Sequence, residues 1–217
     1  MDDVSAESDP KLRVYADSEH ARHYATRWDS PRGRARDARK QRALTAAFAH
    51  LGEFRSVLDA PSGTGRMTEF LGAGRTYIGI DLAAAMLGEA RARHSGAIYV
   101  AGDLAHLPLA DASVDVAVCI RLMHLVRDPA LRVAFLRELA RVARVGVVID
   151  FRHDRSVRTW LGRVRARVGL RARAHNAHAL EVIVAELASA GLTRPHFVPV
   201  RSPAALSDKM VVAAQKP

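Results

Sequence analysis

The chain has 217 residues, of which 49% are hydrophobic, so it is long enough for one domain with a sizeable core, while its apolar runs are too short to span a bilayer. Lysine and arginine number 33 against 23 acidic residues, and the formal net charge of +10 favours contact with anionic partners without bearing on the fold. The single cysteine, Cys119, excludes a disulfide within the chain and a cysteine-rich zinc site, so no metal site is expected.

The N-terminal segment predicts two helices after a frayed start. Residues 1–12 are polar and acidic and lack the apolar core of a secretion signal, so we expect a cytoplasmic protein. Residues 17–29 predict a helix that carries Tyr24 and Trp28 four residues apart, and residues 34–51 predict a longer helix. The sequence Ser30-Pro31-Arg32-Gly33 is expected to separate them.

Short apolar runs alternate with helical patterns from Ser56 onward. Strands are predicted near residues 56–60, 76–80, 97–101, 114–120 and 145–151, and helices near 66–73, 83–93, 129–143 and 177–190. The runs at 114–120 and 145–149 are mostly apolar, which is typical of parallel strands with helices on both faces of the sheet. Cys119 lies in such a run and is expected to be a buried structural thiol.

A glycine-rich turn follows the first predicted strand, and an acid follows each of three strands. The turn is Asp59-Ala60-Pro61-Ser62-Gly63-Thr64-Gly65, and Asp81 lies 18 residues after Gly63, the distance expected for an acid that holds ribose hydroxyls. Asp103 follows the third strand. Three acids suit a cofactor with an amino group, a ribose and an adenine better than they suit a diphosphate.

These motifs resemble those of class I S-adenosylmethionine-dependent methyltransferases, close to the group that methylates small molecules. The resemblance covers residues 50–150 and includes the glycine turn, Gly79-Ile80-Asp81-Leu82, Gly102-Asp103-Leu104 and Leu122-Met123-His124-Leu125. It implies an α/β, Rossmann-like, seven-stranded, mostly parallel sheet that is closed by an antiparallel pair at 195–201 and 208–214. We therefore expect an N-terminal helical lid at 1–50 and a methyltransferase domain at 51–217.

The resemblance also implies which residues bind S-adenosyl-L-methionine. Gly63 and Gly65 would approach its methionine part, Asp59 its ammonium group, Asp81 both ribose hydroxyls and Asp103 the adenine amino group. The remaining implied cofactor contacts are Pro61, Ser62, Leu82, Met86, Leu104, Cys119 and Ile120. Pro61 stands where the family usually has glycine and offers no N–H, but the two glycines nearest the helix remain.

The acceptor region is less specific. His124 follows the fourth strand and would serve as a general base if its pKa lay near the working pH; the alternative is a histidine that only shapes the pocket. The segments that usually form the acceptor pocket offer Tyr15, Tyr24, Trp28, Arg121, Arg152, His153, His175 and His178. Residues 151–180 form a basic, amphipathic insert that is expected to cover the active site, face a charged substrate, contact an anionic membrane surface, or present a plain solvated face.

The predicted function is methyl transfer to an oxygen, nitrogen or carbon nucleophile of a small metabolite with anionic or lipid-like character. An RNA or protein methyltransferase is the first alternative, because basic clusters at residues 20–42 and 151–174 flank the cofactor-binding half of the chain. Nucleic acid is disfavoured because aromatic residues make up only 6% of the chain and Cys119-Ile120-Arg121-Leu122 lacks the prolines and aromatic typical of base amino-methylating enzymes. A non-catalytic cofactor-binding protein is the second alternative, and the sequence leaves the oligomeric state open.

Overall fold

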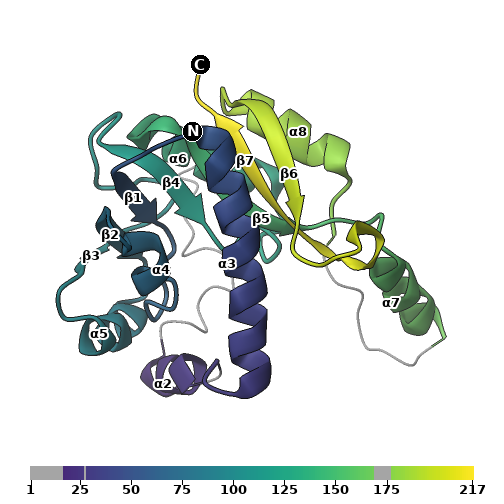
Figure 1. The fold of residues 1–217 in the computed structure, drawn as a ribbon, viewed down its shortest axis with the longest axis horizontal. Coiled ribbons are helices and arrows are strands. Elements are labelled where there is room, and N and C mark those ends of the chain that lie inside the picture. Colours follow the sequence, from purple (N-terminus) through teal and green to yellow (C-terminus); the bar gives the residue numbers. More distant parts are fainter. Residues whose placement is uncertain (1–16, 27, 169–176) are drawn as a thin grey trace.

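The structure, a computed structural model, describes residues 17–26, 28–168 and 177–217, and these build a single seven-stranded sheet with helices on both faces (Figure 1). The strand order is β3-β2-β1-β4-β5-β7-β6. Pairing is parallel from β3 through β5, whereas β7 is antiparallel to both β5 and β6. The predicted sheet and its antiparallel pair are confirmed. The strands are β1 Ser56–Asp59, β2 Thr76–Asp81, β3 Ile98–Ala101, β4 Val114–Cys119, β5 Ala143–Arg152, β6 Thr193–Pro199 and β7 Lys209–Gln215.

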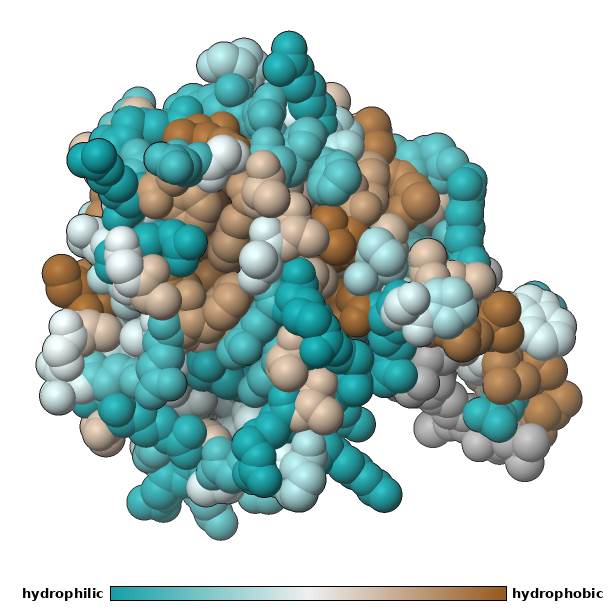
Figure 2. Space-filling model, in the orientation of Figure 1, coloured by the Kyte–Doolittle hydropathy of each residue, from teal (hydrophilic) through white to brown (hydrophobic). Residues whose placement is uncertain are grey.

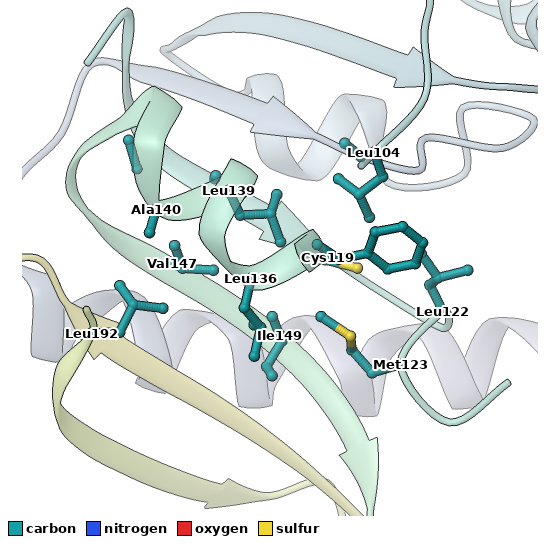
Figure 3. Packing of buried hydrophobic residues seen from close by; sticks show 14 of the residues in the cluster. Leu104, Cys119, Leu122, Met123, Leu136, Leu139, Ala140, Val147, Ile149 and Leu192 are labelled. Carbon is teal, nitrogen blue, oxygen red and sulfur yellow. The ribbon is translucent and has the colours of Figure 1, made fainter. Parts of the chain in front are cut away.

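The alternation of side chains along the central strands divides the core into two layers. Val116 and Val118 of β4 pack in the layer with α3, α4 and α5, while Ala117 and Cys119 pack in the layer with α6 and α8. Figure 3 shows the second layer, where side chains of α6 meet Cys119 and the β5 residues Val147 and Ile149. The helices are α2 Ser18–Thr26, α3 Pro31–Leu51, α4 Thr68–Gly72, α5 Ala84–Arg93, α6 Pro129–Val142, α7 Val157–Arg167 and α8 Leu180–Ser189, with a short 3-10 turn, η3, at Ala204–Leu206.

Helix α3 begins earlier than predicted. Ser30 caps the helix, because its hydroxyl oxygen accepts a hydrogen bond from the N–H of Gly33 at 3.1 Å, and Pro31 occupies the first turn. The predicted break at residues 30–33 is therefore the start of the helix. Leu44, Phe48 and Leu51 of α3 belong to the same buried layer as the sheet, so this helix is part of the domain core and no boundary falls near residue 50.

The shorter helix α2 lies at the edge of the core, where Ala21 and Tyr24 pack with Ala83 and Met86 near the start of α5. Within the described residues of the segment 1–50, α2 contributes Tyr24 to the cavity lining described below, and Asp37 and Lys40 of α3 pair with Arg66 and Asp150. None of the helices in residues 17–26, 28–168 and 177–217 is both long and apolar enough to cross a membrane.

Candidate functional site

A cavity of about 570 Å³ lies at the carboxyl ends of β1, β2, β3 and β4. This is the edge at which open α/β sheets bind ligands, because the turns after parallel strands converge there. Tyr24 of α2 closes one side of it. The lining comprises Tyr24, Asp59, Ala60, Pro61, Ser62, Gly63, Thr64, Arg66, Met67, Ile80, Asp81, Leu82, Ala83, Met86, Gly102, Leu104, Ile120, Arg121, Leu122 and Leu125.

The glycine turn is joined directly to the end of β2. Gly63 has a positive φ of 56°, and its N–H donates a hydrogen bond to Oδ2 of Asp81 at 2.8 Å. The other carboxylate oxygen, Oδ1, accepts from the N–H of Ala83 at 2.9 Å. Burial raises the pKa of Asp81, and these two amide donors oppose that shift. Asp81 therefore holds the turn and the start of α5 while lining the cavity.

The second glycine of the turn has a different role from the one predicted. Gly65 also has a positive φ, 72°, but it is not among the residues that line the cavity. A Cβ atom at this position would lie 2.7 Å from the hydroxyl oxygen of Tyr99 and 2.9 Å from Cδ2 of His94. Close packing against these side chains, together with the backbone conformation, explains the glycine. Pro61, after a cis peptide bond, does line the cavity.

Asp59 presents a buried carboxylate to the cavity. Burial raises its pKa to about 7, although a hydrogen bond from the Tyr77 hydroxyl at 3.1 Å and the charge of Arg66 oppose the shift. A carboxylate in this setting becomes fully ionised at neutral pH only when a further positive charge lies beside it. The observed environment thus favours a cationic ligand at this end of the cavity.

The apolar part of the cavity is formed by Leu82, Met86, Leu104 and Ile120, four of the cofactor contacts that the resemblance implied. Asp103 does not line it; its Oδ1 accepts a hydrogen bond from the N–H of Ala105 at 2.8 Å, within its own loop. Cys119 does not line it either, because its thiol is fully buried in the core layer of α6 and burial raises its pKa. The structural interpretation of Cys119 agrees with this placement.

Arg121, two residues after the end of β4, reaches the cavity wall in an unusual conformation. Its backbone φ is +70°, a value that residues other than glycine rarely adopt. Its main-chain N–H donates a hydrogen bond to Oδ1 of Asp150 at 2.6 Å. The guanidinium carbon lies 4.3 Å from the ring centre of Trp28 and 5.5 Å from that of Tyr24. Of the predicted acceptor residues, Tyr24 and Arg121 therefore line the cavity, and Trp28 is buried beside Arg121.

Buried charges behind Arg121 were not identified as partners from the sequence. Asp150 of β5 forms an ion pair with Lys40 of α3, 110 residues away, and Arg66 pairs with Asp37 of α3. Burial alone would raise the pKa of Asp150, but the charge of Lys40 and the amide of Arg121 hold it well below its usual range. No spacing in the sequence indicates these pairs, because they depend on how α3 crosses the sheet.

His124 is mostly buried and is not among the cavity-lining residues. Burial lowers its pKa to about 4 despite the opposing charge of Asp150, and the positive charges of Arg152, Lys209 and Arg121 lower it further. The expectation of a pKa near the working pH is wrong for this environment. The imidazole is neutral at pH 7 but is a weak base.

The other predicted acceptor residues lie elsewhere or outside the described residues. Arg152 forms an ion pair with Asp208 at 2.7 Å, and the ring Nε2 of His153 donates to the Ser207 carbonyl at 2.6 Å. The main-chain N–H of His178 donates to the Arg152 carbonyl at 2.9 Å. These contacts join the end of β5 to the segments before β7 and α8, and none of the three residues lines the cavity. Tyr15 and His175 lie outside the described residues.

The described parts of the basic insert, residues 151–168 and 177–180, contribute nothing to the cavity lining. Helix α7 stands at one end of the molecule, beside η3 (Figure 1). It exposes Val157, Leu161 and 62% of Trp160, and Figure 2 shows hydrophobic side chains gathered at that end. The expectation that this segment covers the active site is therefore wrong for its described part.

Comparisons with known proteins agree with this geometry. Residues 58–149 match the family model of a methyltransferase domain. A malonyl-[acyl-carrier protein] O-methyltransferase of Pectobacterium atrosepticum is 40% identical over 112 residues, which are 51% of this chain and 42% of that protein. A probable S-adenosylmethionine-dependent methyltransferase of Mycolicibacterium smegmatis is 35% identical over 111 residues, again 51% of this chain and 42% of the relative. The chain thus spans less than half the length of these relatives.

Solved structures share the fold. Magnesium protoporphyrin IX methyltransferase of Synechocystis, with bound S-adenosylhomocysteine, superposes with a TM-score of 0.61 at 18% identity and covers 87% of this chain and 88% of its own. Human N-acetylserotonin methyltransferase, in complex with S-adenosylmethionine, has a TM-score of 0.70 at 13% identity, and the match covers 96% of this chain and 59% of the human chain. Residues 58–149 therefore match a methyltransferase-domain family, and the sheet has the fold of these class I S-adenosylmethionine-dependent methyltransferases.

Proposed function

We propose that this protein binds S-adenosylmethionine in the cavity at the ends of β1 to β4 and transfers its methyl group to an oxygen of a small acceptor. The observation that carries the proposal is the hydrogen bond between the Gly63 N–H and Asp81, which holds a glycine turn and a buried carboxylate on one cavity wall. In a class I fold this is the arrangement that suits a nucleoside with free ribose hydroxyls.

The residues present fit the cofactor at three points. Asp59, whose pKa burial raises to about 7, gains from a neighbouring positive charge such as the cofactor's ammonium group. Asp81 uses one hydrogen bond on each oxygen and retains acceptor capacity for hydroxyls. Leu82, Met86 and Leu104 offer apolar contact to a purine ring.

The chemistry requires little of the protein beyond positioning. When bound, S-adenosylmethionine supplies a methyl group on a sulfonium, so that transfer breaks a C–S bond, forms a C–O bond and leaves S-adenosylhomocysteine. The turn at Gly63, the carboxylate of Asp81 and the side chain of Tyr24 would orient the reactants and exclude water from the cavity. Because His124 is a weak base outside the cavity lining, we expect it to shape the neighbourhood rather than to accept the acceptor's proton.

Two observations support an oxygen acceptor with apolar character. The relative from Pectobacterium is named as an O-methyltransferase, although it shares only 42% of its length with this chain. In addition, Ile120, Leu122 and Leu125 line the cavity after β4 and provide an apolar surface beside Arg121. We therefore favour a small metabolite with an apolar portion over a nucleic acid or protein acceptor.

The proposal is tested by calorimetric titration with S-adenosylmethionine and S-adenosylhomocysteine, followed by a screen of carboxylate, hydroxyl and amine acceptors. Asp81→Ala is the test variant, and Asp111→Ala, which removes an exposed acid from a surface loop, is the matched control. We expect micromolar binding that Asp111→Ala retains and Asp81→Ala loses. Absence of binding in the wild-type protein would refute the cofactor, and tight binding without turnover on any acceptor would replace catalysis with a cofactor-binding role.

A further inference from the structure

The guanidinium of Arg121 stands at the wall of the cavity without an acidic partner among the described residues. Its Nε is buried and has no hydrogen-bond partner there, and none of the ion pairs in the described part of the chain includes it. Arginine donors that are removed from water normally find an acceptor, because leaving such a donor unpaired is unfavourable. The guanidinium thus has donor capacity that no described residue uses, on a side chain that lines the cavity.

The position of this guanidinium is determined by its surroundings. The positive φ of Arg121 is maintained by the hydrogen bond from its N–H to Asp150, which Lys40 in turn holds in a buried ion pair. The rings of Trp28 and Tyr24 stack against the planar group. Backbone strain of this kind persists where the surrounding structure enforces it, and it is concentrated at functional sites.

The charge balance of the cavity makes an anion the suitable ligand at this point. Arg66 also lines the cavity and also stacks on Trp28, but Asp37 forms an ion pair with it. Two acids line the cavity. Asp59 accepts a hydrogen bond from the Tyr77 hydroxyl, and Asp81 accepts hydrogen bonds from the main-chain N–H groups of Gly63 and Ala83. Arg121 thus adds a positive charge for which the described lining supplies no ion-pair partner.

We propose that Arg121 binds an oxyanion, a carboxylate or a phosphate, of the methyl acceptor, so that the enzyme selects acidic small molecules. The proposal rests on the proposed methyl-transfer function and names its acceptor class. A planar guanidinium offers two parallel N–H donors to a carboxylate or phosphate, which fixes the orientation of the acceptor as well as its affinity. The stacked rings of Tyr24 and Trp28 keep the group in place before the anion arrives.

Trp28 provides a direct probe of this site. The chain has two tryptophans, and Trp160 is exposed on α7, so Trp160→Phe leaves Trp28 beside Arg121 as the single fluorescent reporter. In this background, saturated with S-adenosylhomocysteine, malonate, succinate and methyl phosphate are titrated, with malonamide as the uncharged analogue. The ranking of carboxylates against methyl phosphate then identifies which oxyanion the site prefers.

The variants are Arg121→Gln, Arg121→Lys and Arg75→Gln. Arg75 also stacks on an aromatic ring, 4.6 Å from the centre of Phe54, but it lies outside the cavity lining, so it controls for loss of an arginine as such. We expect Arg121→Gln to weaken acid binding by ~30-fold, as for the loss of a charge-assisted hydrogen bond. Arg121→Lys should retain part of the affinity, and Arg75→Gln all of it.

Four outcomes overturn the proposal. The first is equal affinity for the acids in Arg121→Gln and its parent, and the second is equal binding of malonamide and malonate. The third is no fluorescence response to any of the acids. The fourth is that Arg121→Gln binds S-adenosylhomocysteine more weakly but binds methylthioadenosine unchanged. The last result would assign Arg121 to the cofactor's own carboxylate. Failure of wild-type protein to bind S-adenosylhomocysteine would refute the proposed function instead, so the two failures are distinguishable.

Discussion

The N–H of Gly63 donates a hydrogen bond of 2.8 Å to Oδ2 of Asp81 and thereby joins the turn after β1 to the end of β2. The neighbouring Ser62 N–H donates to the Ile80 carbonyl, also at 2.8 Å, so two consecutive amides of the turn are bound to the adjacent strand. The turn and the acid therefore form one unit. A substitution at Asp81 changes the cavity wall as well as the proposed ribose contact.

Asp81→Asn separates these two effects. The asparagine keeps the size of the side chain and one oxygen acceptor but cannot accept from both Gly63 and Ala83 in the same way. We expect a ~10-fold to 100-fold loss of affinity for S-adenosylhomocysteine and a loss of ~1–3 kcal/mol in the free energy of unfolding, as for a buried donor left without its acceptor. Calorimetry and urea denaturation measure the two quantities. An unchanged affinity would show that Asp81 does not contact the cofactor.

The raised pKa of Asp59 predicts that cofactor affinity depends on pH. Because a cation beside this carboxylate favours its ionised form, protons compete with S-adenosylmethionine, and affinity should rise with pH as Asp59 titrates near 7. Asp59→Asn should bind more weakly at pH 8 and show a flatter profile between pH 5.5 and 8. A wild-type affinity that is constant over this interval contradicts the prediction.

The same carboxylate should limit the stability of the empty protein. A folded-state pKa of about 7 in place of 3.8 means that the folded state binds more protons between these values, so stability falls as pH rises through this window. Asp59→Asn removes this charge, and we expect it to raise the free energy of unfolding by ~1–3 kcal/mol at pH 8 and by less at pH 5. Urea denaturation at the two pH values provides the check.

His124 should not determine the acid limb of the pH–rate profile. With a pKa of about 4, the imidazole is already neutral at pH 5 to 8, so its titration cannot produce a rate change near pH 6.5. We expect His124→Gln to retain the shape of the wild-type profile measured at saturating cofactor, with turnover reduced less than tenfold, which is below the usual contribution of a general base. Loss of an inflection near pH 6.5 in the variant would identify His124 as a base after all.

Gly65 and Gly74 form a matched pair for separating packing from backbone strain. Both have positive φ values, 72° and 69°, but a Cβ at Gly65 meets Tyr99 and His94, whereas nothing lies within 4 Å of one at Gly74. We expect Gly74→Ala to cost about 1 kcal/mol and Gly65→Ala to cost at least ~1 kcal/mol more, because overpacking adds to the strain. Equal losses in thermal or urea denaturation would show that Tyr99 moves aside without cost.

The fold was predictable from the sequence because its signals are local and repeated. Apolar runs near β4 and β5, the turn at Gly63 and the acid at Asp81 each follow from a pattern within a few residues, and the structure brings Gly63 and Asp81 together on the predicted edge. An acid after a strand, such as Asp103, fits either a ligand contact or a hydrogen bond within its own loop. In the structure the Asp103 carboxylate accepts a hydrogen bond from the N–H of Ala105 in that loop. A single strand-end acid does not distinguish a ligand contact from a cap.

The rest of the site depends on contacts between distant segments. The start of α3 differs from the prediction because Ser30-Pro31 fits both a break and a helix cap. Without the course of α3, no sequence pattern places Lys40 beside Asp150. The pKa of His124 differs from its predicted value for the same reason, since burial and the charges around it come from several elements. Residue type predicted the candidates, but burial determined their properties.

Lys40 of α3 pairs with Asp150, which accepts a hydrogen bond from the N–H of Arg121, and a double substitution tests how much this ion pair stabilises the fold. Lys40→Met removes one partner and leaves the charge of Asp150 buried, for which we expect a loss of ~3–5 kcal/mol in the free energy of unfolding at pH 7. Lys40→Met combined with Asp150→Asn removes both charges while an amide oxygen remains to accept the Arg121 N–H, so part of the loss should be recovered. The double variant should therefore be more stable than Lys40→Met alone.

The pH dependence distinguishes an ionic role from simple packing. Since the folded-state pKa of Asp150 lies below its usual value, the pair stabilises the wild-type protein above the unfolded pKa of about 4 and loses this contribution as pH falls further. In Lys40→Met the unpaired carboxyl gains a raised pKa, so protonation relieves the buried charge and the deficit relative to wild type should shrink as pH falls from 7 to 5. A deficit of equal size at both pH values, measured by urea denaturation, would mean that Lys40 contributes through its alkyl chain, and the fixed backbone of Arg121 would then depend on the Asp150 hydrogen bond alone.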